Sequence, residues 1–242
     1  MQINWPKPTD FPTLSGGEIH VWAVPLEAIK SPVPELEAVL TPAERKRADL
    51  FVRDEPRRTF VASRAALRSI LGRYLCKSPG DVPIRYAASG KPRLESGDLC
   101  FNLAHSGNLT LIAVTRDGEI GVDVELVRPV DQAHEIAARN FHPAERDTLR
   151  AADTTSLPIT FMRCWTRKEA VLKAIGAGLG YPLAAFDVLT SRHPDQPIEL
   201  PTFESLPPTR CNLHDLNPCT GYAAAVATLK VRQPPLGFTY SL

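Results

Sequence analysis

The hydrophobic and polar positions of this chain follow two different periods, which predict a mixture of strands and helices. Short apolar or alternating runs predict strands over residues 18–24, 82–94 and 100–107, a hairpin over 109–126, and further strands near 185–191 and 221–230. Helix-start signals and apolar residues at helical spacing predict helices over residues 40–51, 57–75, 141–152 and 161–179. The pattern therefore indicates an α+β fold.

The order of these predicted elements repeats along the chain. The helices that begin near residues 40 and 141 share the tetrapeptide Pro-Ala-Glu-Arg, a favourable helix start. Pro143 lies 101 positions after Pro42, and Phe161 lies the same distance after Phe60. This shared offset indicates either a duplicated α+β unit or a chance agreement between two good helix starts.

A duplication predicts two similar halves, residues 1–126 and 127–242, related by a pseudo-twofold axis. The cleft between two such halves is the expected place for a ligand. Prolines gather near both ends of the chain and around residues 201–218, where we expect extended loops.

Composition narrows the class of protein. The 28 basic and 27 acidic residues nearly balance, so the chain has no overall nucleic-acid or membrane signature. Its five cysteines include no C-x-x-C pair, which argues against a zinc site or a disulfide framework and favours reduced thiols. The first 15 residues lack a signal-peptide pattern, and no apolar run reaches the length of a membrane span. We therefore expect a soluble, cytoplasmic, globular protein.

The stretch "GVDVELVRPV" places two acids inside an apolar run. If the stretch is a strand, Val122 and Val124 enter a core while Asp123 and Glu125 stand together on the other face. Two carboxylates at such a short distance repel each other, and each raises the pKa of the other unless a cation lies between them. The alternatives are a half-exposed strand with a solvated face and a cation site.

The helix over residues 161–179 carries a third acid. Glu169 and Lys173 are four residues apart on one helix face, and Trp165 lies four residues before Glu169. One interpretation is a surface ion pair worth about 0.2–0.5 kcal/mol. The other is that Glu169 joins the two strand acids around a hard cation such as Mg²⁺, while Lys173 contacts a phosphate.

Candidate anion ligands lie upstream of the acids. His105, directly after a predicted strand, could donate to a phosphate or be a structural histidine. The basic candidates are Arg45, Lys46, Arg47, Arg57, Arg58 and Lys91. Together these residues predict a magnesium-dependent site for a diphosphate-containing ligand that carries a further phosphate.

Four motifs resemble those of a known family. "SGKPRL", "FNLAHSG", "IGVDVE" and "FMRCWTRKEAVLKAIGAGL" occur in the order and spacing of the Sfp-type 4′-phosphopantetheinyl transferases, over roughly residues 40–190. The two-half, pseudo-twofold fold of that family would also account for the 101-residue offset.

The resemblance implies transfer of the phosphopantetheine arm of coenzyme A to a serine of an apo acyl or peptidyl carrier protein, with release of adenosine 3′,5′-bisphosphate. The acids implied as Mg²⁺ ligands are Asp123, Glu125 and Glu169. Glu169 also matches the family's proposed base, and Lys173 the lysine that contacts the phosphates. The implied coenzyme A ligands are Lys91, His105, Arg47 near the 3′-phosphate, and Arg58 as a second candidate for that role. The resemblance also suggests a monomer, because the cleft forms within one chain.

Two positions depart from the family pattern, and two other functions compete. Ala104 stands where many relatives have serine, and Glu44 where some have a basic residue; both changes bear on phosphate recognition. A non-catalytic coenzyme A- or carrier-binding protein of the same fold is one alternative, although all three acids and Lys173 are present. A magnesium-dependent nucleotide diphosphate hydrolase is the other, although such enzymes commonly cluster their acids on one helix.

Overall fold

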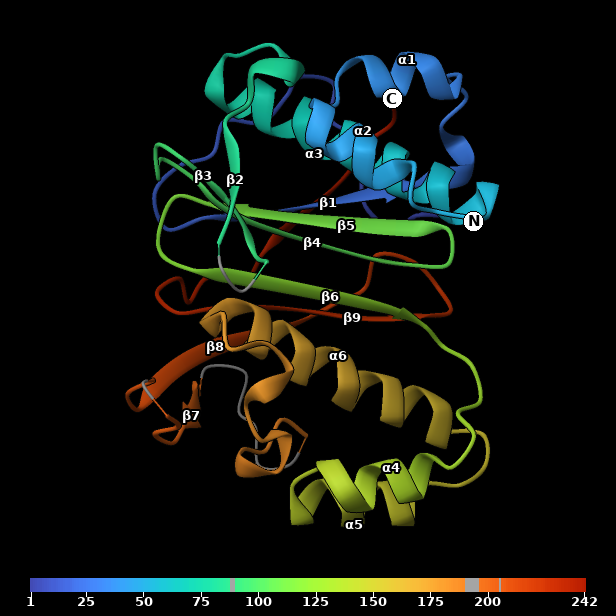
Figure 1. Cartoon of the computed structure of the whole chain (residues 1–242). Coiled ribbons are helices and arrows are strands. Elements are labelled where there is room, and N and C mark those ends of the chain that lie inside the picture. The colour runs from blue at the N-terminus through green and yellow to red at the C-terminus, as the bar shows by residue number, and fades with distance from the viewer. Residues whose placement is uncertain (88–89, 190–195, 205) are drawn as a thin grey trace.

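The chain folds into four layers, with two facing sheets in the middle and helices covering the outer face of each sheet (Figure 1). The computed structural model describes residues 1–87, 90–189, 196–204 and 206–242. The mixed architecture confirms the predicted α+β class. Among the described residues, no helix combines the length and apolar character needed to cross a bilayer.

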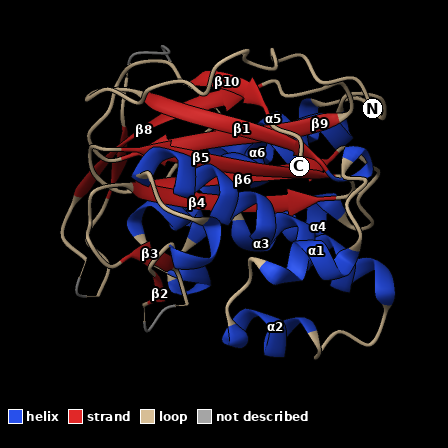
Figure 2. Ribbon diagram, turned by 90° about the horizontal axis from the view of Figure 1, so that it is seen from above, coloured by secondary structure: helices blue, strands red, loops and turns tan. Residues whose placement is uncertain are grey.

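The first sheet has the strand order β10-β1-β5-β4. Its strands are β1 (Ile19–Pro25), β4 (Cys100–Ser106), β5 (Leu109–Thr115) and β10 (Leu236–Thr239). The helices on its outer face are α1 (Val33–Ala38), α2 (Pro42–Ala48) and α3 (Asp54–Leu75). A short hairpin of β2 (Ile84–Tyr86) and β3 (Pro92–Leu94) lies at the side of this half, as Figure 2 shows from above.

The second sheet has the strand order β6-β9-β8-β7. Its strands are β6 (Ile120–Leu126), β7 (Ile198–Leu200), β8 (Thr209–Leu216) and β9 (Tyr222–Thr228). The helices below it are α4 (Ala133–Asn140), α5 (Pro143–Ala151) and α6 (Leu157–Ile175). Helix α6 approaches β6 so closely that a Cβ at Gly121 would lie 2.1 Å from the Ala170 carbonyl oxygen, which explains the glycine before the acids.

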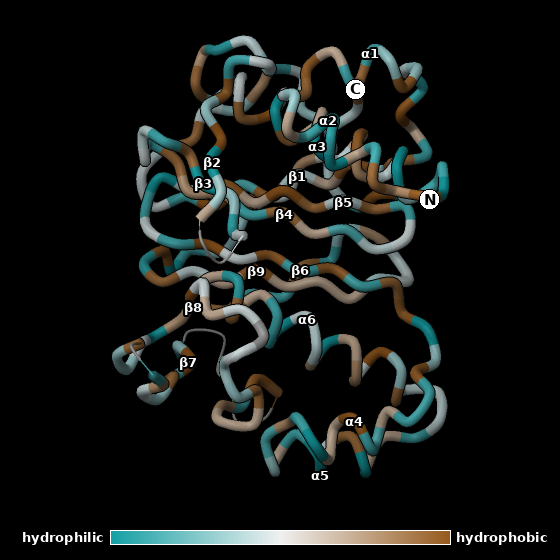
Figure 3. The backbone as a smooth tube through the Cα atoms, in the orientation of Figure 1, coloured by the Kyte–Doolittle hydropathy of each residue, from teal (hydrophilic) through white to brown (hydrophobic). Residues whose placement is uncertain are grey.

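The two sheets face each other across an apolar layer that includes Leu111, Val122, Val124 and Val226. Figure 3 shows the hydrophobic character of β5 at the centre of the molecule. Val122 and Val124 are at most 1% exposed, whereas the alternate residues of β6 face α6 and a pocket. The predicted division of β6 into an apolar and an acidic face is therefore confirmed.

The helices beside each sheet contain a similar buried ion pair between a glutamate and a basic residue. Helices α2 and α5 each begin with a capping box whose glutamate, Glu44 or Glu145, is the third residue of the helix. Arg68 Nε of α3 lies 2.6 Å from Glu44 Oε2, and Lys168 Nζ of α6 lies 2.9 Å from Glu145 Oε2. All four side chains are at most 3% exposed. The repeated order of elements thus extends to the core, while the pseudo-twofold axis remains a prediction.

The path of the chain bears on the predicted boundary between halves. The chain passes from the first sheet to the second after β5, so β6 pairs with β9 over its full length. The division into residues 1–126 and 127–242 remains a prediction, and β6, which ends at Leu126, belongs to the second sheet.

Several elements differ from the sequence-based expectation. Residues 186–189 of the predicted strand 185–191 form no strand, because side chains use the backbone hydrogen-bonding groups there. Val188 N–H donates to the Glu145 carboxylate, and Val188 C=O accepts from the Arg167 guanidinium. Residues 190–191 lie outside the described part of the chain. Residues 201–218, expected as loops, include strand β8, which pairs with β9. The patterns also missed α1, α4, β7 and β10.

Candidate active site

A cavity of about 430 Å³ opens where β4 and β6, the neighbouring edge strands of the two sheets, meet helix α6. Five predicted site residues line it, one from β4, two from β6 and two from α6: His105, Asp123, Glu125, Glu169 and Lys173. Leu103, Ala104 and Trp165 complete the wall. The fold therefore brings together residues that are up to 68 positions apart in the sequence.

The acids in this cavity are held in different ways. Asp123 is 6% exposed, and its Oδ1 lies 2.6 Å from Lys173 Nζ. Glu125 Oε2 accepts a hydrogen bond of 2.7 Å from Ser106 Oγ. Asp123 Oδ2 and Glu169 Oε1 are buried and have no hydrogen-bond partner. Lys173 thus pairs with a strand acid across the cavity and is not a simple surface partner of Glu169.

Burial changes the protonation of this site. It raises the pKa of Asp123 to about 7, with Glu125 and Glu169 adding repulsion and Lys173 opposing the rise. Burial also raises the pKa of Glu169. The His105 ring has a lowered pKa because of its burial and the nearby Lys173 charge. The imidazole is therefore neutral at pH 7 and can act as a donor at one nitrogen.

The donor set suits a hard divalent cation. Three carboxylates face one cavity, and Mg²⁺ prefers such oxygen ligands. Two of these carboxylates have buried oxygen atoms without partners, as expected for atoms that an ion would satisfy. As arranged, no three His, Cys, Asp or Glu side chains of the described residues converge closely enough to bind an ion. Lys173 supplies the positive charge in this arrangement.

Lys91 lies beside the site, in an adjoining cavity of about 290 Å³ that shares Leu103 and Lys173 with the first. Its amine donates to Glu119 Oε2 at 2.8 Å, to the Ile120 carbonyl at 3.1 Å and to the Lys173 carbonyl at 2.6 Å. Lys91 therefore ties the last turn of α6 to β6. The contact between Lys91 and coenzyme A that the family resemblance implies stays a prediction.

Arg47 and Arg58 line neither cavity. The Arg47 guanidinium lies over the Phe60 ring, 5.7 Å from its centroid. Arg58 donates to the Ile29 carbonyl at 2.8 Å, which fixes it to the loop before α1. Arg64 connects Arg47 to the adjoining cavity, because Arg64 lies over the same Phe60 ring at 5.4 Å and lines that cavity.

Arg64 is a candidate phosphate ligand that the sequence patterns did not single out. It is 8% exposed, and its Nη1 is buried without a hydrogen-bond partner. Burial lowers the pKa of this guanidinium, so a bound anion would relieve an unfavourable charge. The available signal was an arginine within the apolar face "FVASRAALRSIL", four residues before the arginine that pairs with Glu44.

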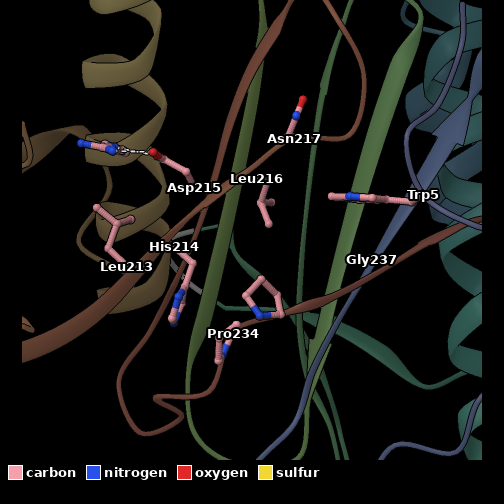
Figure 4. Close-up of a pocket in the computed structure, with 10 residues that line it drawn as sticks. Trp5, Leu213, His214, Asp215, Leu216, Asn217, Pro234 and Gly237 are labelled. Atoms are coloured by element: carbon pink, nitrogen blue, oxygen red, sulfur yellow. Dashed lines mark hydrogen bonds and ion pairs between the residues drawn. The ribbon is translucent and has the colours of Figure 1, made fainter. Parts of the chain in front are cut away.

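A pocket of about 420 Å³ lies elsewhere, against β8, the Trp5 segment and the residues before β10 (Figure 4). None of the predicted site residues lines it. Asp215 in its wall accepts hydrogen bonds from Arg167 of α6. The predicted acids, His105, Lys173 and Lys91 thus line the β4–β6–α6 cavity or its neighbour, whereas Arg47 and Arg58 line neither.

Comparison with known proteins agrees with this site. Residues 119–227, which contain all three acids and Lys173, match the model of the 4′-phosphopantetheinyl transferase superfamily. The chain is 40% identical over 233 residues to the 4′-phosphopantetheinyl transferase HetI of Nostoc sp., covering 94% of each chain. It is 29% identical over 188 residues to the 4′-phosphopantetheinyl transferase Sfp of Bacillus subtilis, covering 77% of this chain and 81% of that one. Over 140 residues it is 34% identical to the 4′-phosphopantetheinyl transferase AcpT of Salmonella typhimurium, covering 57% and 71% of the two chains. The resemblance carried by the four motifs is thereby confirmed, and the chain belongs to the 4′-phosphopantetheinyl transferase superfamily as an enzyme of this kind.

Proposed function

We propose that this enzyme uses Mg²⁺ to transfer the 4′-phosphopantetheine group of coenzyme A to a serine of an apo acyl or peptidyl carrier protein, releasing adenosine 3′,5′-bisphosphate. The observation that carries the proposal is the single cavity in which three carboxylates, Lys173 and His105 meet. The activities named for its relatives agree with it.

Asp123, Glu125 and Glu169 would hold the cation, since they present hard oxygen ligands from two sides of the cavity. When bound, Mg²⁺ neutralises charge on the diphosphate and on the leaving bisphosphate. The partnerless oxygens of Asp123 and Glu169 support this assignment.

Glu169 is the proposed base for the carrier serine. A serine hydroxyl is a weak nucleophile until a positioned group accepts its proton, and burial raises the Glu169 pKa toward the range where a carboxylate does this well. Trp165, one turn earlier in α6, lines the wall of the same cavity.

Lys173 and His105 are the proposed contacts for the reacting phosphates. Lys173 would stabilise charge on the departing phosphate and donate a proton to it. The neutral His105 ring can donate from one nitrogen to a phosphate oxygen. Arg64 lines the adjoining cavity, and Arg47 lies over the same Phe60 ring; both are candidates to meet further phosphate charge.

We also propose that the enzyme works as a monomer in the cytoplasm. The candidate site is lined by residues of both sheets and α6 of a single chain. None of the five cysteines forms a disulfide, as suits a reducing compartment.

Product analysis tests the proposal. The enzyme is mixed with coenzyme A, Mg²⁺ and a panel of apo carrier proteins from fatty acid, polyketide and nonribosomal peptide synthesis. The mass of each carrier protein is then measured by mass spectrometry. We expect the mass of one phosphopantetheine on at least one carrier, and loss of the reaction in excess chelator. Bisphosphate released without carrier modification would indicate a hydrolase, and binding without either product a non-catalytic protein.

An acid-to-alanine pair identifies the metal site in the same assay. Asp123→Ala should abolish most transfer, because it removes a buried ligand. Asp147→Ala is the matched control, since Asp147 is 73% exposed on α5 and pairs only with Arg150 in the ion pairs of the described residues. Equal rates for the two variants would refute the metal assignment.

A further inference from the structure

The free edge of β6 is held by side chains instead of a neighbouring strand. Strand β6 ends its sheet, so the backbone groups on its outer edge need other partners. Val122 N–H donates to Asn102 Oδ1 at 3.0 Å, and Leu126 N–H donates to Ser106 Oγ at 3.1 Å. Both acceptors lie on β4, the edge strand of the other sheet. The two donors are four residues apart on β6, and the two acceptors are four residues apart on β4.

These two contacts enclose the part of the site that spans the sheets. Asp123 and Glu125 lie between the two anchored residues of β6, and His105 lies between Asn102 and Ser106 on β4. Since β4 and β6 belong to different sheets, no ladder of backbone hydrogen bonds sets their register. The two side chains supply that register.

Ser106 also contacts an acid directly. Its hydroxyl donates to Glu125 Oε2 at 2.7 Å while it accepts from the N–H of the next residue, Leu126. A hydroxyl has one hydrogen to donate and lone pairs to accept, so both bonds form at once. The direction of the O–H bond is thereby fixed, and with it the rotation of the Glu125 carboxylate.

We propose that Ser106 is a positioning residue for Glu125, and that Asn102 fixes the other end of the same segment. Together they hold the acids of the second sheet in register with His105 of the first. The inference rests on the proposed metal-dependent transfer, in which Glu125 binds the cation. Hydrogen bonds that orient a metal ligand typically change metal affinity by about 10–100-fold when they are removed.

Direct binding of Mn²⁺, without coenzyme A or carrier, provides the test. Free Mn²⁺ is measured by electron paramagnetic resonance during titration of the wild type, Ser106→Ala, Ser106→Thr and Asp123→Ala. We expect about 10-fold weaker binding by Ser106→Ala, near wild-type binding by Ser106→Thr, which keeps the hydroxyl, and no measurable binding by Asp123→Ala. Because Leu126 is 39% exposed, we expect water to replace the lost acceptor and Ser106→Ala to remain folded.

Ser63→Ala is the matched control. Its Oγ lies 2.7 Å from Thr110 Oγ1 in a buried contact between α3 and β5. This variant should lower the melting temperature and leave Mn²⁺ affinity unchanged. Such a result separates positioning of Glu125 from a general loss of stability.

The outcomes distinguish two failures. Wild-type affinity in Ser106→Ala, or equal losses in Ser106→Ala and Ser106→Thr, would overturn the positioning role while the metal site stands. Absence of Mn²⁺ binding by the wild type, or full binding by Asp123→Ala, would overturn the proposed metal site and the positioning role with it.

Discussion

Lys173 Nζ lies 2.6 Å from Asp123 Oδ1, so a lysine of α6 partly neutralises the most buried acid of the site. The lysine also donates to the Val122 carbonyl at 3.2 Å, on the free edge of β6. Asp123 nevertheless has a pKa of about 7, because burial outweighs this pairing. At pH 7 the Asp123 carboxyl is therefore only partly ionised.

The first prediction is a loss of stability with rising pH in metal-free protein. The Asp123 pKa is about 7 when folded and near 3.8 when unfolded, so only the folded state holds this proton between those values. Stability from this group is full below pH 3.8 and is lost as pH rises to 7, at roughly 1.4 kcal/mol per pH unit. Urea unfolding in chelator, compared with Asp123→Asn, isolates the effect. A difference between the two proteins that does not vary with pH would contradict it.

The second prediction concerns Lys173→Ala. Transfer should slow by about 10²–10⁴-fold, the range for loss of a proton donor or charge stabiliser. The pKa of Asp123 should rise further, since Lys173 is the partner that lowers it. We therefore expect the variant to lose more stability at pH 8 than at pH 5, where Asp123 is protonated. Turnover at the wild-type rate in Lys173→Ala would contradict the proposed catalytic role of Lys173.

Local signals in the sequence were sufficient for the acidic strand and the helix starts. The alternation of apolar and acidic residues around Asp123 and the Pro-Ala-Glu-Arg helix starts are each determined by residues close together in the sequence. The structure contains both features. Strand β10 was missed because its partner β1 lies more than 200 residues earlier, and no local pattern encodes that parallel pairing.

The parts of the site that were missed depend on contacts between distant segments. Arg64 becomes buried, with its Nη1 lacking a hydrogen-bond partner, only when α3 packs against the β2–β3 hairpin and β4, which no helical period reveals. Lys173 was expected either to pair with Glu169 or to contact a phosphate; its pairing with Asp123 was missed, because sequence spacing cannot show that β6 brings Asp123 close to it. The functional family was nevertheless accessible, since its motifs lie within continuous segments.

The third prediction concerns the buried ion pair of the second half. Lys168→Ala should destabilise the protein by about 3–5 kcal/mol, because it leaves the Glu145 carboxylate buried without its cation. Arg150→Ala removes an ion pair that is at least 66% exposed and should cost about 1 kcal/mol or less. Chemical unfolding at pH 7 compares them. Equal losses would mean that the Glu145 site is readily solvated or relaxes.

The last prediction concerns Arg47 and the 3′-phosphate of coenzyme A. Glu44, three residues earlier, pairs with Arg68 and so leaves the Arg47 charge available to a ligand. The Arg47 guanidinium lies over the Phe60 ring beside Arg64 and so extends the positive charge beyond the two cavities. Arg47→Ala should therefore raise the KM for coenzyme A and change kcat little, because it removes binding that is equal in the ground and transition states.

Two substrates distinguish this role from a general loss of affinity. Wild type should prefer coenzyme A over 3′-dephospho-coenzyme A, and Arg47→Ala should lose much of that preference, since charge-assisted bonds to the phosphate are gone. Arg58→Ala tests the second candidate, whose guanidinium already donates to the Ile29 carbonyl. Arg150→Ala, on the surface of α5, should retain the wild-type ratio. If Arg47→Ala keeps the wild-type preference for coenzyme A while Arg58→Ala loses part of it, the 3′-phosphate contact would be assigned to Arg58 of α3 instead of Arg47 of α2.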